Sequence, residues 1–440
     1  MSRAARLLPS SPATSRRTLL RAGAAAAGLA AVGARPWARG ASAATDLSVL
    51  APLAPDPAPP GVAKFAESQF ADWQAKNDVK VAYEAVAWPQ LHDKMATNFA
   101  SGQHVYDVMY SSGWVPEFSK FLAPLDAMLP ADLVADLPPS SFSTTTWDGK
   151  RYGVVFTLSL LTLFYNTELL DQAGLTAPPK TWDELKGYAL ELTKDGRYGW
   201  VLNYGAPEGI GGVASYWMAF LQQAGGKMYG DDGLPVFNDA PGVDALKLMV
   251  EMMTNGSTDP GSLSYVGIND ATNVLTAGNA AMMMNWPFMW KPANDPESSQ
   301  IVGKLGSAIL PAGPVTSASI DGTDAWTIAA DCAAPAKAMD LIGFYLSPEV
   351  QKAQWLDTGW LPIRLSVLAD PEVQAAAPNA AVVLEQSKLP YDSFVTPDYN
   401  EVTVALGTEI QKALGGAKSP EAALKDASDQ VTEIVKKRLG

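Results

Sequence analysis

The sequence predicts an α/β protein built from two lobes. Segments with strand-like and helix-like patterns alternate along the chain, which is typical of folds with helices packed on sheets. Once an export segment at the start is set aside, about 397 residues remain, more than one hydrophobic core usually serves. Apolar residues make up 48% and charged residues 18% of the chain, as in an ordinary globular protein. These observations favour two compact α/β units over one.

Residues 1–43 are predicted to be a twin-arginine signal peptide. Arg16 and Arg17 precede an Ala- and Gly-rich run, residues 22–32, and Ala41-Ser42-Ala43 offers a small-x-small cleavage site. The apolar run is too short to cross a bilayer, which needs about 20 residues. We therefore expect export to the periplasm of a chain that has already folded in the cytoplasm.

The mature chain is strongly acidic. Residues 1–43 hold seven arginines and no acidic residue, so their removal leaves 25 basic and 46 acidic residues, a net charge of −21. Such a chain repels phosphate backbones, and we expect no nucleic-acid partner. Sites for strong anions normally use several guanidinium groups. Few arginines remain for such a site: Arg151, Arg197, Arg364 and Arg438.

Cysteine and histidine are too scarce for several kinds of site. Cys332 is the single cysteine, so no intramolecular disulfide is expected. His92 and His104 are the only histidines, which excludes a poly-His metal site and a HExxH protease motif. We expect both histidines to be structural and Cys332 to be inert, and we expect no metal, no cofactor and no catalytic residue.

The first elements follow a strand–helix–strand order, which favours a right-handed and largely parallel sheet. The expected elements are a strand at 47–50, a helix starting at Pro59-Pro60, a strand at 79–86, a helix at 90–101 and a strand at 105–110. The last of these strands runs into a loop, Ser111-Ser112-Gly113-Trp114.

Three helix starts are explicit further along the chain. Thr181 is predicted to be an N-cap with Glu184 completing a capping box. Pro348 and Pro420 each follow a serine and suit the first helical position. The helix after Pro420 carries one apolar stripe and should dock on a lobe. Its stripe consists of Leu424, Ala427, Val431, Ile434 and Val435.

Residues 277–290 are the most informative stretch for function. A helix ends at Ala277-Gly278, and an apolar strand rich in methionine follows. Because Pro287 cannot donate to a ladder, the strand must end at or before Trp286. Trp286 and Trp290 are thus delivered at a strand end, where open α/β folds place ligands. The alternative is that both indoles only fill the core.

Short segments in a fixed order link this chain to a known family. They are residues 106–110, 114–118, 122–125, 152–154, 164–170, 173–175, 181–185, 224–226, 236–238, 277–290, 347–351 and 359–362. Their order and spacing resemble the extracellular solute-binding proteins of bacterial carbohydrate importers, the maltose-binding-protein-like group. The sequences of these segments are most similar to the sugar-and-polyol branch of that group.

The resemblance implies the two-lobed, type II periplasmic binding protein fold, with hinge-linked lobes made of discontinuous segments. One lobe would hold residues 44–155 and 320–364, and the other would hold residues 156–319 and 365–440. Chain crossings would fall near Phe156, Ser319 and Arg364. Rotation of the lobes about these crossings would close a cleft over the ligand.

The resemblance also implies the function. The protein would be a monomeric periplasmic receptor, not an enzyme, that binds a neutral sugar or polyol and delivers it to the membrane permease subunits of an ABC importer. Trp286 would be the stacking platform, with Trp290 as support. The remaining expected ligand-binding residues are Ser111, Ser112, Trp114, Tyr204, Asp324, Trp360 and Arg364.

Departures from the family pattern leave alternatives open. Ser111-Ser112-Gly113 stands where an acidic residue often grips a hydroxyl pair, and Asp324 either replaces that acceptor or caps a turn. Tryptophans and a net charge of −21 also suit an aromatic cage for a cation such as a polyamine or quaternary amine. An exported glycosidase, with two carboxylates about 5–10 Å apart, is the third hypothesis.

Overall fold

The computed structural model describes residues 45–52, 67–87, 90–206, 212–267, 269–376, 378–392 and 394–439. The predicted signal peptide and the helix start at Pro59-Pro60 lie outside these residues. Thr45–Gly440 forms one compact unit. Within the described ranges, no helix has the length and apolar character needed to cross a membrane.

The N-terminal sheet has five strands in the order β2-β1-β3-β12-β6. They are β1 (Thr45–Pro52), β2 (Val79–Val86), β3 (Val108–Ser111), β6 (Gly153–Val155) and β12 (Ala325–Ile328). Strand β1 runs parallel to β2 and β3, whereas β12 runs antiparallel to both β3 and β6. The predicted parallel sheet is therefore confirmed except at β12, which enters from far along the chain.

A second sheet of four strands has the order β10-β7-β9-β8. Its members are β7 (Thr162–Asn166), β8 (Tyr198–Trp200), β9 (Ala280–Asn285) and β10 (Leu305–Ala308). Every residue of β9 is buried, as its methionines and alanines predict. The strand ends one residue before Trp286, which confirms the position that Pro287 imposes.

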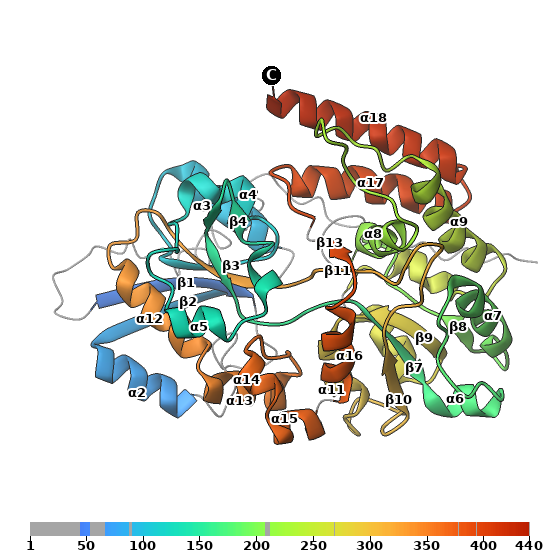
Figure 1. Cartoon of the computed structure of the whole chain (residues 1–440), viewed down its shortest axis with the longest axis horizontal. Helices are drawn as coiled ribbons and strands as arrows, with labels where there is room; N and C mark the ends of the chain where they lie inside the picture. The colour runs from blue at the N-terminus through green and yellow to red at the C-terminus, as the bar shows by residue number, and fades with distance from the viewer. Residues whose placement is uncertain are drawn as a thin grey trace, which may run out of the picture. The chain divides into compact units, whose positions relative to one another are not determined.

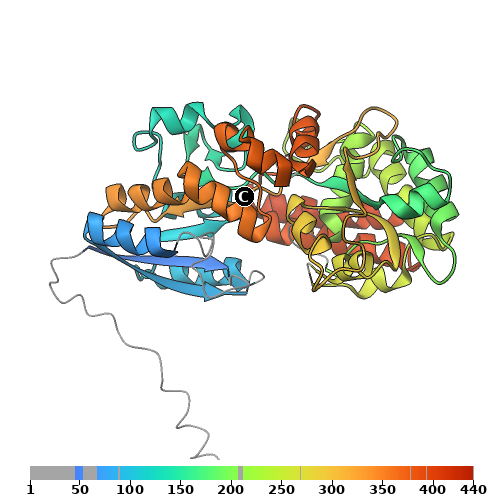
Figure 2. The same cartoon turned by 90° about the horizontal axis from the view of Figure 1, so that it is seen from below.

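Helices from distant parts of the chain cover the N-terminal sheet (Figures 1 and 2). Helix α12, orange in Figure 2, lies against strand β12 of this sheet, and α13 packs on α12. The elements of this part are α2 (Glu67–Asn77), α3 (Leu91–Ser101), α4 (Val115–Phe118), η3 (Ser119–Phe121), α5 (Ala131–Ala135), η4 (Pro139–Phe142), β4 (Thr146–Trp147), β5 (Lys150–Arg151), α12 (Pro335–Tyr345), α13 (Pro348–Thr358) and α14 (Leu365–Leu368).

The remaining elements surround or follow the second sheet (Figure 1). They are α6 (Thr167–Gln172), α7 (Trp182–Leu192), α8 (Val213–Gln223), α9 (Ala240–Thr254), η5 (Pro260–Ser264), α10 (Asp270–Thr276), η6 (Pro287–Met289), α11 (Trp290–Ala293), β11 (Ser319–Ile320), α15 (Pro371–Ala376), α16 (Pro378–Gln386), β13 (Tyr391–Asp392), α17 (Tyr399–Leu414) and α18 (Pro420–Leu439).

The predicted cap of α7 is confirmed with one difference. The Thr181 hydroxyl accepts a hydrogen bond from the Glu184 backbone N–H at 3.2 Å. The Glu184 carboxylate accepts from the Lys180 backbone N–H at 2.6 Å, one residue before the cap itself. Both interactions satisfy N–H groups at the entry to the helix, where the helix offers no acceptors.

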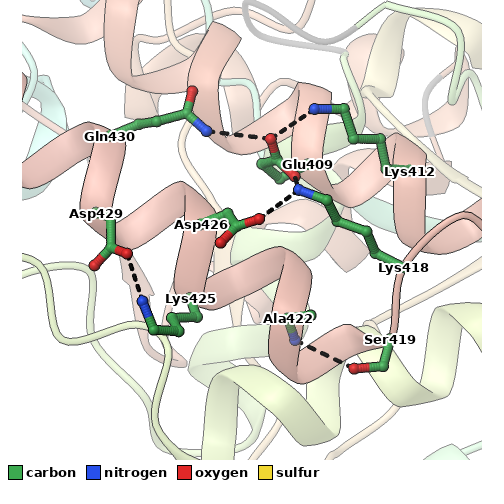
Figure 3. A network of polar contacts seen from close by, with 9 residues as sticks. All are labelled: Glu409, Lys412, Lys418, Ser419, Ala422, Lys425, Asp426, Asp429 and Gln430. Atoms are coloured by element: carbon green, nitrogen blue, oxygen red, sulfur yellow. Dashed lines mark hydrogen bonds and ion pairs between the residues drawn. The ribbon is translucent and has the colours of Figure 1, made fainter.

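Helices α17 and α18 lie side by side, and α18 also contacts α9. The predicted apolar stripe of α18 is buried except at Ile434, which is half-buried. A polar network joins the same two helices (Figure 3). The buried Glu409 carboxylate accepts hydrogen bonds from Lys412 at 2.7 Å, from Gln430 at 3.1 Å and from Lys418. Lys418 also reaches Asp426 at 2.6 Å.

Three linking segments lie side by side: residues 156–160 between β6 and β7, residues 321–324 between β11 and β12, and residues 359–364 between α13 and α14. The Gly322 N–H donates to the Ser159 carbonyl at 2.9 Å, next to a bridge between Leu160 and Asp321. The Thr157 hydroxyl donates to the Leu361 carbonyl at 2.9 Å. Hydrogen bonds and isolated β-bridges therefore hold these segments to one another.

Candidate functional site

The end of β3 positions the first group of polar side chains. The strand begins at Val108 rather than at residue 105 and includes Ser111, which pairs with Ala325 of β12. Ser111 is therefore a strand residue, not the loop residue that was predicted. It is buried, and its Oγ has no hydrogen-bond partner in the described part of the chain. Ser112 follows it and is also buried.

Asp324 directly precedes β12 and faces the end of β3. Its backbone carbonyl accepts from the Phe156 N–H at 3.1 Å, which fixes the residue on the linking segment. Burial raises the pKa of its carboxyl from 3.8 to about 7, although hydrogen bonds from Tyr110 and Ser112 act in the opposite direction. The charge of Asp321 adds to the rise. This carboxyl therefore changes its protonation state near neutral pH.

Trp286 follows β9 of the second sheet, and its indole packs on Gly322, in the same linking segment as Asp324. A Cβ added at Gly322 would lie 2.5 Å from the indole Cζ3 atom, so glycine is needed for this close approach. The Asn285 side-chain oxygen accepts from the Trp286 backbone N–H at 2.8 Å and holds the residue as β9 ends. The indole is buried, and its Nε1 lacks a hydrogen-bond partner among the residues described.

Tyr399, the first residue of α17, completes the group and was missed by sequence reasoning. Its ring lies 3.6 Å from the position of a Cβ at Gly113, whose φ of +77° favours glycine. Burial, and then the charge of Asp324, raise the pKa of its phenol. Its hydroxyl is buried without a partner in the described ranges. No local motif marks Tyr399, because it meets Gly113 and Asp324 only through the tertiary fold.

Trp114 and Tyr204, which were predicted to bind the ligand, are buried in the protein, and their described ring contacts are with residues outside this polar group. Trp114 is 3% exposed, and its ring packs on His92 with centroids 5.5 Å apart. Tyr204 is 1% exposed, and its ring lies 6.3 Å from that of Tyr216. Burial raises the pKa of the Tyr204 phenol. Both side chains make the contacts of core residues.

Two other predicted residues lie at the third linking segment. Trp360 stacks on Phe156, with ring centroids 5.6 Å apart, and is half-buried. The Arg364 Nε donates to the Asp136 carboxylate at 2.7 Å, and its Nη1 donates to the Leu346 carbonyl at 3.0 Å. The Arg364 guanidinium is therefore held by the protein itself and ties α5 to the end of α12.

The residues that the structure brings together are Ser112, Trp286, Asp324 and Tyr399, with Ser111 beside them on β3. They offer a carboxyl group, hydroxyl groups, an indole N–H and aromatic faces. A buried donor or acceptor without a partner costs free energy, so such groups normally meet a partner. In the described residues, no group of three or more His, Cys, Asp or Glu side chains is arranged to hold a metal ion.

Comparison with known proteins identifies the relatives of this fold. Residues 58–352 match the family described as bacterial extracellular solute-binding protein. A probable ABC transporter-binding protein of Deinococcus radiodurans is 28% identical over 369 residues, covering 81% of this chain and 86% of the relative.

Two solved structures are also similar. A maltose-bound MalE3 of T. maritima has a TM-score of 0.79 at 26% identity, covering 89% of this chain and 100% of its own. An ABC transporter solute-binding protein of Agrobacterium vitis with bound D-mannitol has a TM-score of 0.76 at 25% identity, covering 90% and 99%. Both have the two-lobed type II fold, so the predicted fold class is confirmed.

Proposed function

Because the chain belongs to the family of bacterial extracellular solute-binding proteins, we propose that it is a periplasmic receptor for a neutral sugar or polyol. It binds this ligand between its lobes and delivers it to the permease subunits of an ABC importer. It does so as a monomer and carries out no reaction on the ligand. Relatives of known structure with bound maltose and D-mannitol support this class of ligand.

The observation that carries the proposal is the group around Asp324. Asp324, Trp286 and Tyr399 come from distant parts of the sequence and lie close to residues 322–324. The indole N–H of Trp286 and the hydroxyl of Tyr399 have no partner among the described residues. Ligand hydroxyl groups both donate and accept, so they suit such a mixture. Hydrogen bonds of about 1 kcal/mol net each and aromatic contacts of about 1 kcal/mol reach the roughly −8 kcal/mol of a micromolar complex.

The proposal includes the predicted lobes, residues 44–155 with 320–364 and residues 156–319 with 365–440. The hydrogen-bonded linking segments would then be the hinge, and Trp286 and Asp324 would approach the ligand from different lobes. The twin-arginine signal peptide would bring the folded chain to the periplasm. The predicted contacts of Ser111, Ser112, Trp114, Tyr204, Trp360 and Arg364 with the ligand remain part of this proposal.

The test is a ligand panel applied to the chain from residue 44 onward. We expect titration calorimetry to find a sugar or polyol with a dissociation constant near the micromolar range. At 100 times that constant the ligand should add about 2.7 kcal/mol to the free energy of unfolding. Trp286→Ala should weaken binding at least tenfold because it removes the stacking face, whereas Trp290→Ala is the matched control. Equal losses for both variants would contradict the role of Trp286.

The cationic alternative makes a different prediction. An amine needs the ionised Asp324 carboxylate, so its affinity should rise about tenfold from pH 6 to pH 8 through the pKa near 7. Binding of amines alone in the panel would refute the sugar proposal. Steady release of product from a glycoside would instead support the glycosidase hypothesis.

A further inference from the structure

A turn rich in hydroxyl groups lies beside the candidate site and has no role in the proposal so far. Residues 141–145, hereafter the hydroxyl turn, include the last two residues of the short helix η4 and read Ser-Phe-Ser-Thr-Thr. Ser141, Thr144 and Thr145 are each more than nine-tenths buried. The Oγ atoms of all three lack a hydrogen-bond partner in the ranges that the structure describes.

The hydroxyl turn packs on the face of the N-terminal sheet that carries Ser111. A Cβ added at Gly153 of β6 would lie 3.0 Å from Thr145 Cγ2 and 3.3 Å from Ala325 Cβ, so Thr145 covers this face. Ser111 pairs directly with Ala325, and directly opposed residues point to the same face of a sheet. The orphan hydroxyls of Ser111 and Thr145 therefore flank the same alanine.

The hydroxyl turn also touches the linking segment on which Trp286 rests. Ser143 donates to the Asp321 carboxylate at 3.4 Å, and the other oxygen of this carboxylate accepts from the Thr323 N–H at 2.9 Å. Asp321 is the neighbour of Gly322, the residue beneath the Trp286 indole. The turn and the tryptophan thus meet the same short stretch of chain.

We propose that the hydroxyl turn is a second subsite of this receptor, which recognises adjacent uncharged hydroxyl groups of its ligand through Ser141, Thr144 and Thr145. This inference rests on the proposed function. Asp324 and Asp321 lie on opposite sides of Gly322, and the ligand would extend from Asp324 past Trp286 toward the turn. Hydroxyl side chains can donate or accept as the O–H bond rotates, so they suit sugar hydroxyls and offer no charge to an ion.

The geometry favours a ligand over a purely structural role for the turn. Among the described residues, the hydroxyl groups of Ser111, Ser141, Thr144 and Thr145 have no hydrogen-bond partner, although backbone groups of the turn are paired. The Thr145 N–H donates to Phe142 O at 3.2 Å, and Thr145 O accepts from Tyr152 N at 2.9 Å. The fold therefore does not need the side-chain hydroxyls to hold the turn. One or two buried water molecules are the competing occupant.

The test removes hydroxyls without changing side-chain shape. Thr144→Val with Thr145→Val should weaken the wild type's tightest sugar or polyol about tenfold or more in calorimetry. Thr144→Ser with Thr145→Ser should restore binding to within threefold. Thr258→Val is the matched control, because Thr258 is another buried threonine with an unpartnered Oγ, next to Trp200 of the second sheet. It should leave affinity unchanged.

Ligand analogues decide whether the contact is direct. A deoxy analogue that lacks the recognised hydroxyl should bind the wild type weakly and should lose little further affinity in the double valine variant. Ser141→Ala, a smaller change, provides the same comparison if the double variant does not fold. Unchanged affinity in these variants, with or without a change in melting temperature, would overturn the subsite and favour buried water. A wild type that binds no sugar or polyol would instead overturn the proposed function itself.

Discussion

Asp324 shows how opposing effects act on a single residue of the candidate site. Burial raises the pKa of its carboxyl to about 7, whereas Tyr110 and Ser112 stabilise the ionised form by hydrogen bonding. Gly322, two residues earlier, has the opposite kind of role, because only the absence of a side chain lets Trp286 approach. The segment thus combines a titratable carboxyl group at Asp324 with a position, Gly322, where the absence of a side chain makes room for Trp286.

The raised pKa predicts a pH-dependent stability. The folded state binds the Asp324 proton more tightly than the unfolded state, whose carboxyl has a pKa near 3.8. The free energy of unfolding should therefore fall as pH rises from about 4 to 7 and level off above that. Asp324→Asn removes this term, so the variant should gain roughly 1–3 kcal/mol over the wild type between pH 4 and pH 8.

Urea denaturation of both proteins at several pH values measures this difference. The comparison with the wild type cancels the other titrating groups, which both proteins share. A difference between variant and wild type that does not change from pH 4 to pH 8 would contradict the raised pKa.

Helix α17 illustrates how one element organises several parts of the protein. Its first residue, Tyr399, reaches the candidate site, and Glu409 anchors the network with α18 (Figure 3). Between α17 and the segment after β8, the Gln411 side-chain amide donates to the carbonyls of Tyr204 and Gly205, each at 2.8 Å. The position of Tyr399 therefore depends on contacts along the whole helix.

Glu409 should be the most sensitive polar residue of this element. Burial alone would raise the pKa of its carboxyl, but hydrogen bonds from Lys412, Lys418 and Gln430 lower it below its ordinary value. Its contribution to stability is present above about pH 4.5 and is lost as pH falls through the lowered pKa. Glu409→Gln leaves two lysines without their shared carboxylate and should cost about 2–4 kcal/mol.

Chemical denaturation at pH 7 tests this expectation. Glu433→Gln is the control, because Glu433 and Lys436 form an exposed pair at 3.6 Å, and its loss should cost less than about 0.5 kcal/mol. If Glu409→Gln proves as stable as the control, the buried network does not stabilise the pair of helices.

At the scale of the whole molecule, two sheets are joined by segments that pair with one another. Strand β12 shows the consequence most clearly, because it completes the N-terminal sheet from a position more than 200 residues after β3. The proposed export after folding would keep these long-range pairings intact.

Export should depend on the arginine pair. Replacing Arg16 and Arg17 by lysine should retain the uncleaved precursor in the cytoplasm, because this route reads the arginine pair itself. Cell fractionation and mass spectrometry measure the outcome, and cleavage after Ala43 is expected in the wild type. The control replaces Arg35 and Arg39, which lie after the apolar run, by lysine. Equal export of both variants would contradict the proposed twin-arginine route.

The sequence alone determined the features that short stretches encode. Proline and serine at helix starts, the Thr181 cap and the end of β9 before Trp286 each depend on a few neighbouring residues, and the structure confirms them. The family and fold class were also predictable, because the order of many short segments survives along the chain.

The tertiary structure alone decided which side chains meet. It brings Tyr399 against Gly113, holds Arg364 on Asp136 and places the hydroxyl turn beside Asp321. Each pair is separated by more than 150 residues, and no local pattern specifies such a contact. Strand register and helix packing over the whole chain determine these neighbours, so the walls of the candidate site become visible only in the folded protein.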